Sequence, residues 1–486
     1  MRTHPGPLAV SLLALAAYTT FSTVQWRRLE TPSWDLGIFT QLARRYAALE
    51  APVVNVKGDG YNLLGDHFHP LLVLLGVPYR IAPSALTVMV VQDVLLAFSV
   101  WVIAREAARR LGAVQGTAVG FAYAASFGLV GAVAVQFHEI AFAVPLLAVS
   151  LVALLRERWL AAVLWAAPLV FVKEDLGSNV VALGLVLWWR ARSSSRAVSV
   201  ADERHDEHRR GERLGLGLAA WGAVWLVLAQ KVILPAFNPD GEFAYADRLD
   251  VGALLRQPWL LVGHLVDDQR KLATLAVLIL ATGLVGLRSP VLLVAVPTLL
   301  WRFWSGNYGF WGYTWHYSAI LMPVAFAALL DGVDLAAASP RRWLRGLGTS
   351  AVAICVTAAV VMLPRLPLGR FGDPSFWEPN PRADAAHRIL DAVPDGVSVE
   401  TDVGLMSYLV DTRDVFWFGN DGNPAPDYLV FDTAWGGTPG TRPALLDWAA
   451  EHHPDASYQV VAADGGYLLA RRTDGRPQDE RPHDGP

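Results

Sequence analysis

The stretch LVFVKEDLGSNVVALGLVLWW, residues 169–189, decides the fold class of this chain. An apolar run is interrupted by Lys173, Glu174 and Asp175, and the apolar run then resumes. Burying one ionisable group at the centre of a bilayer costs about 2.5–3.5 kcal/mol on insertion scales. Three such groups in succession therefore persist only in a polar cavity or at an interface, which predicts two membrane helices that meet at a polar site.

The composition of the whole chain agrees with a membrane protein. Of its 486 residues 53% are hydrophobic and 17% are charged, against about 25% charged in an average globular domain. The net charge is only -4, and no soluble segment interleaves Lys and Arg with aromatic residues, which argues against a nucleic-acid partner. We therefore expect a multi-pass protein whose constant partners are membrane lipids.

The apolar segments predict about eleven spans, each long enough or nearly long enough to cross a bilayer. They form an all-α polytopic bundle and cover residues 7–26, 84–104, 113–135, 140–155, 159–172, 176–190, 214–234, 271–287, 289–303, 316–335 and 347–364.

Basic residues fall on every second connection between these spans. They are Arg105, Arg109, Arg110, Arg156, Arg158, the segment 190–213, Arg288, Arg341, Arg342 and Arg345. The positive-inside rule places these connections in the cytoplasm together with the N-terminus. The polar, mixed-charge segment 191–213 is predicted to be a flexible loop. The intervening loops and everything after Pro364 are then predicted to be extracytoplasmic.

The predicted domain plan has three parts. Residues 1–364 form the transmembrane domain, whose first outer loop is 27–83, and residues 365–475 form a small extracytoplasmic α/β domain. Its strands are predicted at 397–400, 414–418, 427–432 and 458–463, and its helices near 383–392, 402–410 and 443–452. Residues 476–486 are predicted to be disordered.

Ionisable residues gather on the predicted outer side. Asp35 opens an amphipathic segment, so it is either a helix cap or a general base or metal ligand. His67 and His69 flank Phe68, and an imidazole beside a carboxylate suits a metal, a phosphate or a hydrogen-bonded turn. These alternatives stay open at this point.

Two further groups share that side. Glu139 begins a span, where a carboxylate complements the positive helix end, and His138 precedes it. Lys173, Glu174 and Asp175 are either an internally neutralised ion-pair cluster or a site where Lys173 binds phosphate and a carboxylate orients an acceptor or metal.

An aromatic loop at 301–315 completes the candidate residues. Trp304 and Trp311 either anchor the loop at the interface or stack on a sugar or a polyprenyl chain. Arg302 is the candidate for a bidentate contact to a lipid phosphate.

These motifs resemble an uncharacterised family of bacterial multi-pass membrane proteins related to the GT-C glycosyltransferases. The resemblance covers roughly the first 180 residues, and it rests on Trp34-Asp35-Leu36-Gly37-Ile38-Phe39 with Gln41, Gly65-Asp66-His67-Phe68-His69-Pro70, Phe137-His138-Glu139 and Lys173-Glu174-Asp175-Leu176-Gly177.

The resemblance implies a polyprenyl-phosphate sugar donor and an acidic residue in the first outer loop that acts as general base or helps to hold a metal. Asp35 matches that acid by position, but Leu36 follows it where a second acid would make a pair, which leaves a Mg or Mn cofactor undecided. By residue type and placement, His138 and Glu174 join Asp35 as catalytic candidates. His67, Lys173, Arg302, Trp304 and Trp311 are candidates for substrate binding, and His69 and Glu139 for metal binding.

The function that the sequence favours is transfer of a sugar to an envelope glycan, lipid or protein on the extracytoplasmic face. A transporter or lipid flippase would also keep ionisable residues in a membrane cavity. A non-catalytic envelope protein is the third alternative. Convergence of the candidates at one outer pocket would favour the enzyme.

Overall fold

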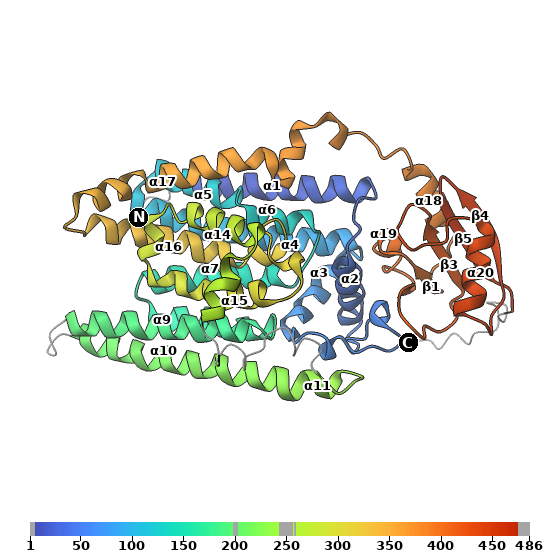
Figure 1. The fold of residues 1–486 in the computed structure, drawn as a ribbon, viewed down its shortest axis with the longest axis horizontal. Helices are drawn as coiled ribbons and strands as arrows, with labels where there is room; N and C mark the ends of the chain where they lie inside the picture. Colours follow the sequence, from blue (N-terminus) through green and yellow to red (C-terminus); the bar gives the residue numbers. More distant parts are fainter. Residues whose placement is uncertain (1–4, 198–202, 243–255, 257–258, 475–486) are drawn as a thin grey trace. The chain divides into compact units, whose positions relative to one another are not determined.

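The computed structural model describes residues 5–197, 203–242, 256 and 259–474 (Figure 1). The chain forms two compact units. The membrane unit comprises Met1–Ser22, Leu64–Leu74 and Met89–Trp377, and the sheet unit comprises Thr23–Leu63, Leu75–Val88 and Glu378–Pro486. Each unit is described by itself below. The predicted disordered tail at 476–486 lies outside the described residues.

Helices make up the described part of the membrane unit. The longer ones are α1 (Gly6–Arg27), α4 (Ala85–Leu111), α5 (Ala113–Ala124), α6 (Phe127–Ala134), α7 (Ile140–Leu155), α8 (Trp159–Ala166), α9 (Leu176–Ala197), α10 (Glu203–Leu228), α13 (Trp259–Val266), α14 (Gln269–Ala281), α15 (Val296–Trp304), α16 (Leu321–Ala337) and α17 (Arg342–Met362). Short turns join them: the 3-10 turns η4 (Ala167–Phe171), η7 (Val285–Arg288), η8 (Pro290–Ala295), η9 (Tyr308–Phe310), η10 (His316–Ser318), η11 (Leu363–Arg365), η12 (Pro367–Gly372) and η13 (Pro374–Phe376), the π-helical turn η5 (Ala229–Ile233) and the short helix α11 (Leu234–Phe237).

Fewer helices than the eleven predicted spans are long and apolar enough to cross a bilayer. Among the described residues five meet that requirement, or six if the bent pair α5 and α6 is one span. Proline explains why two of the predicted spans contain only a short α-helix. Pro168 lies in the 3-10 turn that follows α8, and Pro290 begins the 3-10 turn η8 that precedes α15. A proline lacks the backbone N–H that a continuous helix requires, and an apolar run read from the sequence does not reveal such breaks.

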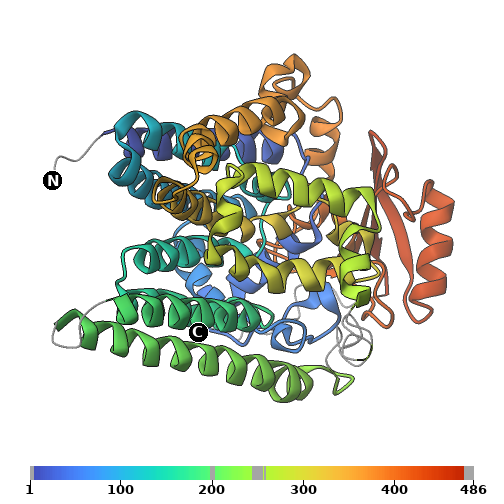
Figure 2. The same cartoon turned by 60° about the vertical axis from the view of Figure 1, so that its left-hand side comes forward.

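Helices α9 and α10 form a long antiparallel pair, in which they lie side by side in both views (Figures 1 and 2). Small residues at the contact allow their backbones to approach closely. A Cβ on Gly184 would lie 2.7 Å from the carbonyl oxygen of Gly215, and one on Gly177 would lie 2.9 Å from that of Gly222. The predicted flexible loop at 191–213 is wrong for most of its length, because α9 continues to Ala197 and α10 begins at Glu203.

The centre of the membrane unit is formed by helices that are buried along most of their length. In α7, fourteen of the residues between Ile140 and Leu155 are buried, and α16 is buried along most of its length. A helix that is hydrophobic all round belongs in a core rather than on one face of a bundle. These two helices also contact each other. The segments that carry His138 and His316, described below, lead directly into these two helices.

The sheet unit contains a five-stranded mixed sheet in the order β2-β1-β3-β5-β4. Its strands are β1 (Ser398–Thr401), β2 (Asp414–Trp417), β3 (Tyr428–Asp432), β4 (Tyr458–Asp464) and β5 (Tyr467–Arg472). Strand β1 pairs in parallel with β2 and β3, whereas β5 pairs antiparallel with β3 and β4. The four predicted strands are confirmed within about a residue at their ends, and β5 is the one that the prediction missed.

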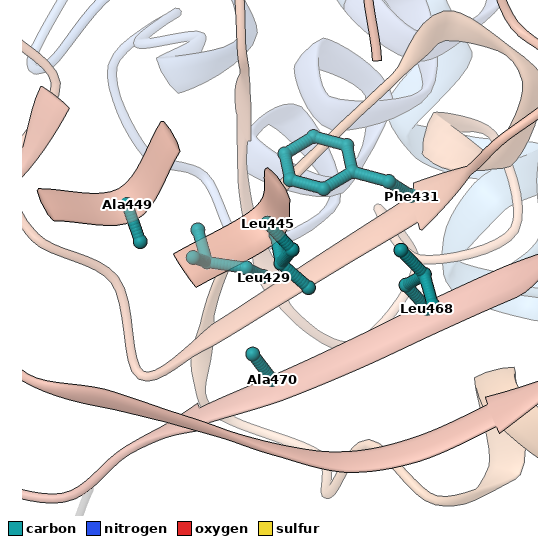
Figure 3. Packing of buried hydrophobic residues seen from close by; sticks show 6 residues of the cluster. All are labelled: Leu429, Phe431, Leu445, Ala449, Leu468 and Ala470. Carbon is teal, nitrogen blue, oxygen red and sulfur yellow. The ribbon is translucent and has the colours of Figure 1, made fainter. Parts of the chain in front are cut away.

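Helices α18 (Ala383–Asp391), α19 (Val403–Met406) and α20 (Arg442–His452) accompany the sheet. The core between the sheet and α20 consists of buried residues that alternate along the strands (Figure 3). They are Leu429, Phe431, Leu445, Ala449, Leu468 and Ala470.

The segment after α1 also belongs to the sheet unit. It contains α2 (Trp34–Ala47), the 3-10 turn Asn55–Lys57 and α3 (Gly76–Ile81). The buried amide of Gln41 ties these parts together, since it donates to the Val415 carbonyl at 3.3 Å and accepts from the Val56 N–H at 3.1 Å. Met406 packs against Gly37, where no Cβ would fit.

Candidate functional site

The candidate site of the membrane unit begins with the loop that carries His67 and His69. Gly65 packs so closely on the backbone of Phe237 that a Cβ would lie 2.5 Å from it, and the Asn238 side chain donates to the Gly65 carbonyl at 3.0 Å. Phe68 then stacks on Trp225 with ring centroids 5.6 Å apart. The loop is therefore anchored on both sides of His67.

Glu174 joins this loop to the turn before α9. Its Oε1 lies 2.9 Å from Nδ1 of His67, and its Oε2 accepts the Phe68 backbone N–H at 3.1 Å. Only 4% of the Glu174 side chain is exposed. A buried carboxylate is tolerated when both oxygens have partners, and Glu174 meets this requirement.

Lys173 pairs with a different carboxylate. Its Nζ lies 2.5 Å from Oε1 of Glu139, and the other oxygen of Glu139 lies 3.1 Å from Nδ1 of His138. The prediction that the Lys-Glu-Asp run forms ion pairs within itself does not agree with these contacts, because Lys173 and Glu174 each take a partner distant in sequence. We call His67, His69, His138, Glu139, Lys173 and Glu174, together with His316, the imidazole cluster.

His316 enters the cluster from η10. Its ring stacks on that of His138 with centroids 3.7 Å apart and an interplanar angle of 22°. His316 is buried, and neither of its ring nitrogens has a hydrogen-bond partner among the described residues. An imidazole nitrogen left in this state is available to a ligand.

Burial and charge set the protonation of the histidines. Burial and the Lys173 ammonium lower the pKa of His67, but the Glu174 and Asp66 carboxylates outweigh them and leave that pKa above its ordinary value. Burial lowers the pKa of His69 to about 4 and that of His138 well below its ordinary range. Near neutral pH these two rings are therefore neutral bases, whereas the equilibrium of His67 is shifted towards its charged form.

The other charged groups stay ionised. Burial lowers the pKa of Lys173, yet Glu139, Glu174 and Asp175 more than restore it, so the pKa is raised overall. Burial raises the pKa of Glu139, but the Lys173 ammonium outweighs it and leaves that pKa lowered. The pKa of Glu174 is likewise lowered, because His67 outweighs burial. Burial raises the pKa of Asp175 to about 6.

A divalent metal suits part of this arrangement. A ring nitrogen of His138 and one of His316 lie within 4.8 Å of each other, and two nitrogens that share one ion lie at most about 4.2 Å apart at metal–nitrogen distances of about 2.1 Å. Nδ1 of His138 accepts the Ile140 N–H at 3.3 Å, so Nε2 is the ring nitrogen that would bind a ligand. The residues present thus fit a metal after a small movement of the rings.

Arg302 has a structural role that the sequence did not indicate. Its side chain is fully buried, and it donates to the carbonyls of Phe310 at 2.8 Å, Gly312 at 2.7 Å and Tyr317 at 3.3 Å, and to the Ser318 hydroxyl at 3.3 Å. The prediction of a guanidinium that faces a lipid phosphate does not agree with these contacts, because all its nitrogens bind the chain itself.

The two predicted tryptophans lie in the same aromatic region. Trp311 donates from Nε1 to the Ser305 carbonyl at 2.9 Å, and the Lys271 ammonium lies 4.1 Å from its ring centroid. Trp304 lies 4.7 Å from the His264 ring. These contacts describe how the region is built, and a role in substrate binding stays a prediction.

Asp35 belongs to the sheet unit, in the first turn of α2. The cap of this helix is Ser33, whose hydroxyl accepts the Leu36 N–H at 3.1 Å. The interpretation of Asp35 as the cap is therefore wrong, whereas its role as general base stays a prediction.

Sequence reasoning missed two buried residues of the membrane unit. They are Gln92 in α4, which binds the backbone around His138, and His316, which follows the predicted aromatic loop 301–315. An amide inside an apolar span was the available signal for Gln92, since buried polar side chains need partners.

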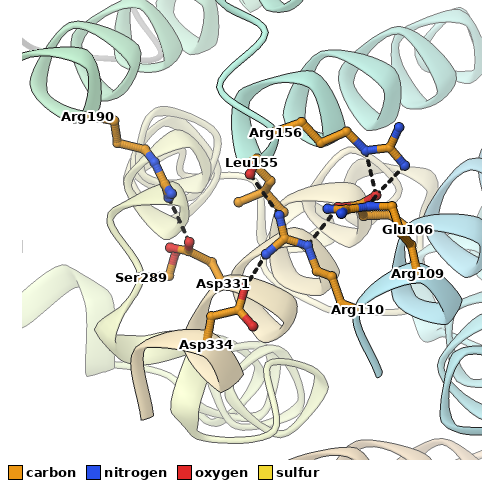
Figure 4. A network of polar contacts seen from close by, with 9 residues as sticks. All are labelled: Glu106, Arg109, Arg110, Leu155, Arg156, Arg190, Ser289, Asp331 and Asp334. Carbon is orange, nitrogen blue, oxygen red and sulfur yellow. Dashed lines mark hydrogen bonds and ion pairs between the residues drawn. The ribbon is translucent and has the colours of Figure 1, made fainter. Parts of the chain in front are cut away.

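A second group of charges in the membrane unit, the arginine cluster, contains Glu106, Arg109, Arg110, Arg156, Arg190, Ser289, Asp331 and Asp334 (Figure 4). Glu106 is completely buried and accepts hydrogen bonds from three guanidinium groups, at 2.5–2.9 Å. Asp331 accepts from Arg190 at 2.8 Å and from Ser289 at 2.6 Å, and Arg110 also pairs with Asp334.

The fold has a counterpart among solved structures. The chain is similar to ArnT from Cupriavidus metallidurans bound to undecaprenyl phosphate, with 13% identity and a TM-score of 0.54 over 96% of this chain and 98% of that chain. The archaeal oligosaccharyltransferase AglB from Archaeoglobus fulgidus, in complex with an inhibitory peptide and a dolichol-phosphate, also matches, with 12% identity and a TM-score of 0.47 over 98% of this chain and 75% of that chain. The first match shows a GT-C-like fold. No curated protein matches the chain.

The predicted family is confirmed at the level of sequence. The family described as Predicted membrane protein (DUF2079) matches residues 25–469, so this chain belongs to that family of multi-pass membrane proteins.

Proposed function

We propose that this protein is a membrane glycosyltransferase that transfers a sugar from a polyprenyl phosphate to an acceptor on the extracytoplasmic face. The observation that carries the proposal is the imidazole cluster, in which buried cations, carboxylates and neutral imidazoles converge within a GT-C-like fold. The solved structure of similar fold binds undecaprenyl phosphate, which supports a lipid phosphate as the donor here.

The reaction joins an acceptor hydroxyl to the anomeric carbon of the donor sugar. The bond from that carbon to the phosphate oxygen breaks, and the polyprenyl phosphate leaves with the electron pair. The proton of the hydroxyl passes to a carboxylate, for which Asp35 is our candidate. Positioned general bases contribute about 10²–10⁴-fold to such rates.

Lys173 and His67 are the candidate contacts to the leaving phosphate. The Lys173 ammonium has three donors, and Glu139 engages one of them. Nδ1 of His67 lies 2.9 Å from Oε1 of Glu174, and the negative charge of Glu174 favours the protonated form of the ring. Cations held in place by fixed carboxylates stabilise developing negative charge without having to reorganise. Glu174 and His138 are further candidates for orienting the acceptor.

A divalent ion would be held by His138 and His316, with Glu139 and His69 next to them; two imidazole nitrogens suit Mn better than Mg, which prefers oxygen ligands. When bound, such an ion polarises a phosphate oxygen and neutralises its charge. The chain's own residues hold the His138 ring: the Ile140 N–H donates to its Nδ1 at 3.3 Å, and the stacking with His316 limits its rotation.

The basic loops support a cytoplasmic N-terminus and an extracytoplasmic C-terminal region. In that orientation the acceptor is an envelope glycan, lipid or protein. Trp304 and Trp311 are candidate stacking surfaces for a sugar or a polyprenyl chain.

The direct test measures release of free polyprenyl phosphate from a panel of lipid-phosphate sugars by the purified protein in lipid nanodiscs. Wild type is compared with Asp35→Asn and with Asp59→Asn, an exposed aspartate after the Asn55–Lys57 turn. We expect release by wild type and Asp59→Asn, and a loss of at least about 10²-fold in Asp35→Asn.

Equal release by all three proteins would remove Asp35 from the mechanism. Absence of release with every donor and acceptor would contradict the enzyme and favour a transporter, a lipid flippase or a non-catalytic envelope protein.

A further inference from the structure

The stacked pair His138 and His316 is assembled from segments far apart in sequence. His138 lies between α6 and α7, and His316 begins η10. Both rings are buried. Stacking of two imidazoles supplies little energy by itself, so the two backbones that carry them must be held from outside the pair.

Gln92 holds the backbone of the first ring. Its Nε2 donates to the carbonyls of Ala132 at 3.0 Å and Gln136 at 2.6 Å, and its Oε1 accepts the His138 N–H at 3.2 Å. Gln136 has a positive φ of 71°, a conformation that costs energy for a side-chain-bearing residue. One buried amide thus binds the chain before, within and after this strained turn.

Arg302 holds the backbone of the second ring. It binds the carbonyls of Phe310 and Gly312 before His316, and the carbonyl of Tyr317 and the hydroxyl of Ser318 after it. Helix α6 closes the other side, because a Cβ on Gly131 would lie 2.6 Å from the Thr314 carbonyl. The fixed planar fork of a guanidinium can reach several acceptors at once, which a lysine cannot do.

We propose that Gln92 and Arg302 are positioning residues that set the geometry of the His138–His316 pair. The inference rests on the proposed function for its kinetic consequence, and it replaces the phosphate contact predicted for Arg302. Neither side chain touches the reacting groups. Each acts through the backbone on either side of one imidazole, and a displacement of about 1 Å in a catalytic group can cost about 10²-fold in rate.

The first test needs no activity. Full-length wild type, Gln92→Met and Arg302→Lys in nanodiscs are treated with diethyl pyrocarbonate, and labelling of each histidine is quantified by mass spectrometry. His208 and His453, which are buried elsewhere in the chain, report global unfolding. We expect labelling to rise several-fold at His138 in Gln92→Met and at His316 in Arg302→Lys, and to stay low at His208 and His453.

Ser99→Ala is the matched control. Ser99 is buried in the same helix as Gln92, but its hydroxyl donates to the Leu96 carbonyl and accepts from Tyr123. We expect wild-type labelling in this variant. Unchanged labelling of both imidazoles in Gln92→Met and Arg302→Lys would overturn the inference, as would an equal rise at all four histidines, which would show that these residues serve global stability.

The second test is a kinetic cycle with His138→Gln. If Gln92 acts through His138, Gln92→Met lowers kcat about tenfold to 10²-fold in the wild-type background with little change in KM, and has no further effect in the His138→Gln background. Equal effects in both backgrounds would overturn the inference.

The two proposals fail in different ways. Local labelling without any glycosyl transfer would support the positioning role and contradict the proposed function. Transfer activity with unchanged labelling, and with equal effects of Gln92→Met in both kinetic backgrounds, would support the proposed function and contradict the positioning role.

Discussion

The membrane unit has ionic clusters at the two ends of the same helices, and the clusters differ in what their cations can do. Glu139 immediately precedes α7 and Arg156 immediately follows it; Lys173 and Glu174 precede α9, and Arg190 lies about two turns before its end. At 1.5 Å per residue the clusters are about 24–26 Å apart along these helices, against a hydrocarbon core of about 30 Å.

The arginine cluster is built from permanent charges. Glu106 binds three guanidinium groups that cannot lose their protons. In the imidazole cluster, by contrast, His67 and Glu174 share a proton-bearing contact, and His138 is neutral. Buried charge alone therefore does not identify a reactive site. The capacity to exchange protons or bind a ligand distinguishes the two clusters.

The largest expected effect is on stability, at the arginine cluster. Glu106→Gln removes the fully buried anion that three guanidinium groups share, and breaking a buried pair costs about 3–5 kcal/mol. Glu174→Gln should cost much less, because His67 can release its proton and remain neutral. Thermal unfolding of both variants in nanodiscs measures the difference. A smaller loss in Glu106→Gln than in Glu174→Gln would contradict this account of the two clusters.

The next effect is on activity and has the opposite pattern. Glu174→Gln removes the anion that keeps His67 charged, so release of polyprenyl phosphate should fall about 10²-fold. Glu106→Gln should retain the wild-type rate per folded molecule, because none of its partners belongs to the imidazole cluster. Rates are normalised to the folded fraction from size-exclusion chromatography. Loss of activity in Glu106→Gln at an unchanged folded fraction would show that the arginine cluster also contributes to the reaction, and would contradict the separation of the two clusters.

The sequence alone identified much of the imidazole cluster. His67, His138, Lys173 and Glu174 stood out because ionisable groups at the ends of apolar runs are costly unless they have partners. Alternating apolar residues likewise predicted the strands around Leu429 and Phe431.

The partners could not be predicted, because they depend on contacts between distant segments. Residue type does not show that Lys173 takes Glu139 while Glu174 takes His67. The role of Arg302 was misjudged for the same reason: a guanidinium in an outer aromatic loop suits a phosphate equally well until the loop carbonyls around it are seen. Strand β5 was missed because its basic end, Arg471 and Arg472, hides the pattern of an edge-adjacent strand.

Metal binding should distinguish the clusters with an effect of about tenfold. Neutral imidazoles bind divalent ions, whereas guanidinium groups do not. We expect His316→Gln to weaken Mn²⁺ binding about tenfold and Arg190→Gln to leave it unchanged. The electron paramagnetic resonance signal of free Mn²⁺ gives the affinity directly, without any assay of turnover. Equal binding by wild type and His316→Gln would remove the imidazole pair as the metal site.

The smallest effect is expected within the arginine cluster itself. Arg109 is 39% exposed and shares Glu106 with two better buried arginines, and an exposed partner of this kind contributes about 0.2–1 kcal/mol. Arg110 is 11% exposed and binds Glu106, Asp334 and the Leu155 carbonyl. Arg109→Ala should therefore lower the unfolding temperature far less than Arg110→Ala. Similar decreases in the unfolding temperature would mean that each guanidinium group stabilises Glu106 equally. The total charge around Glu106, rather than the burial of individual contacts, would then determine the stability of the network.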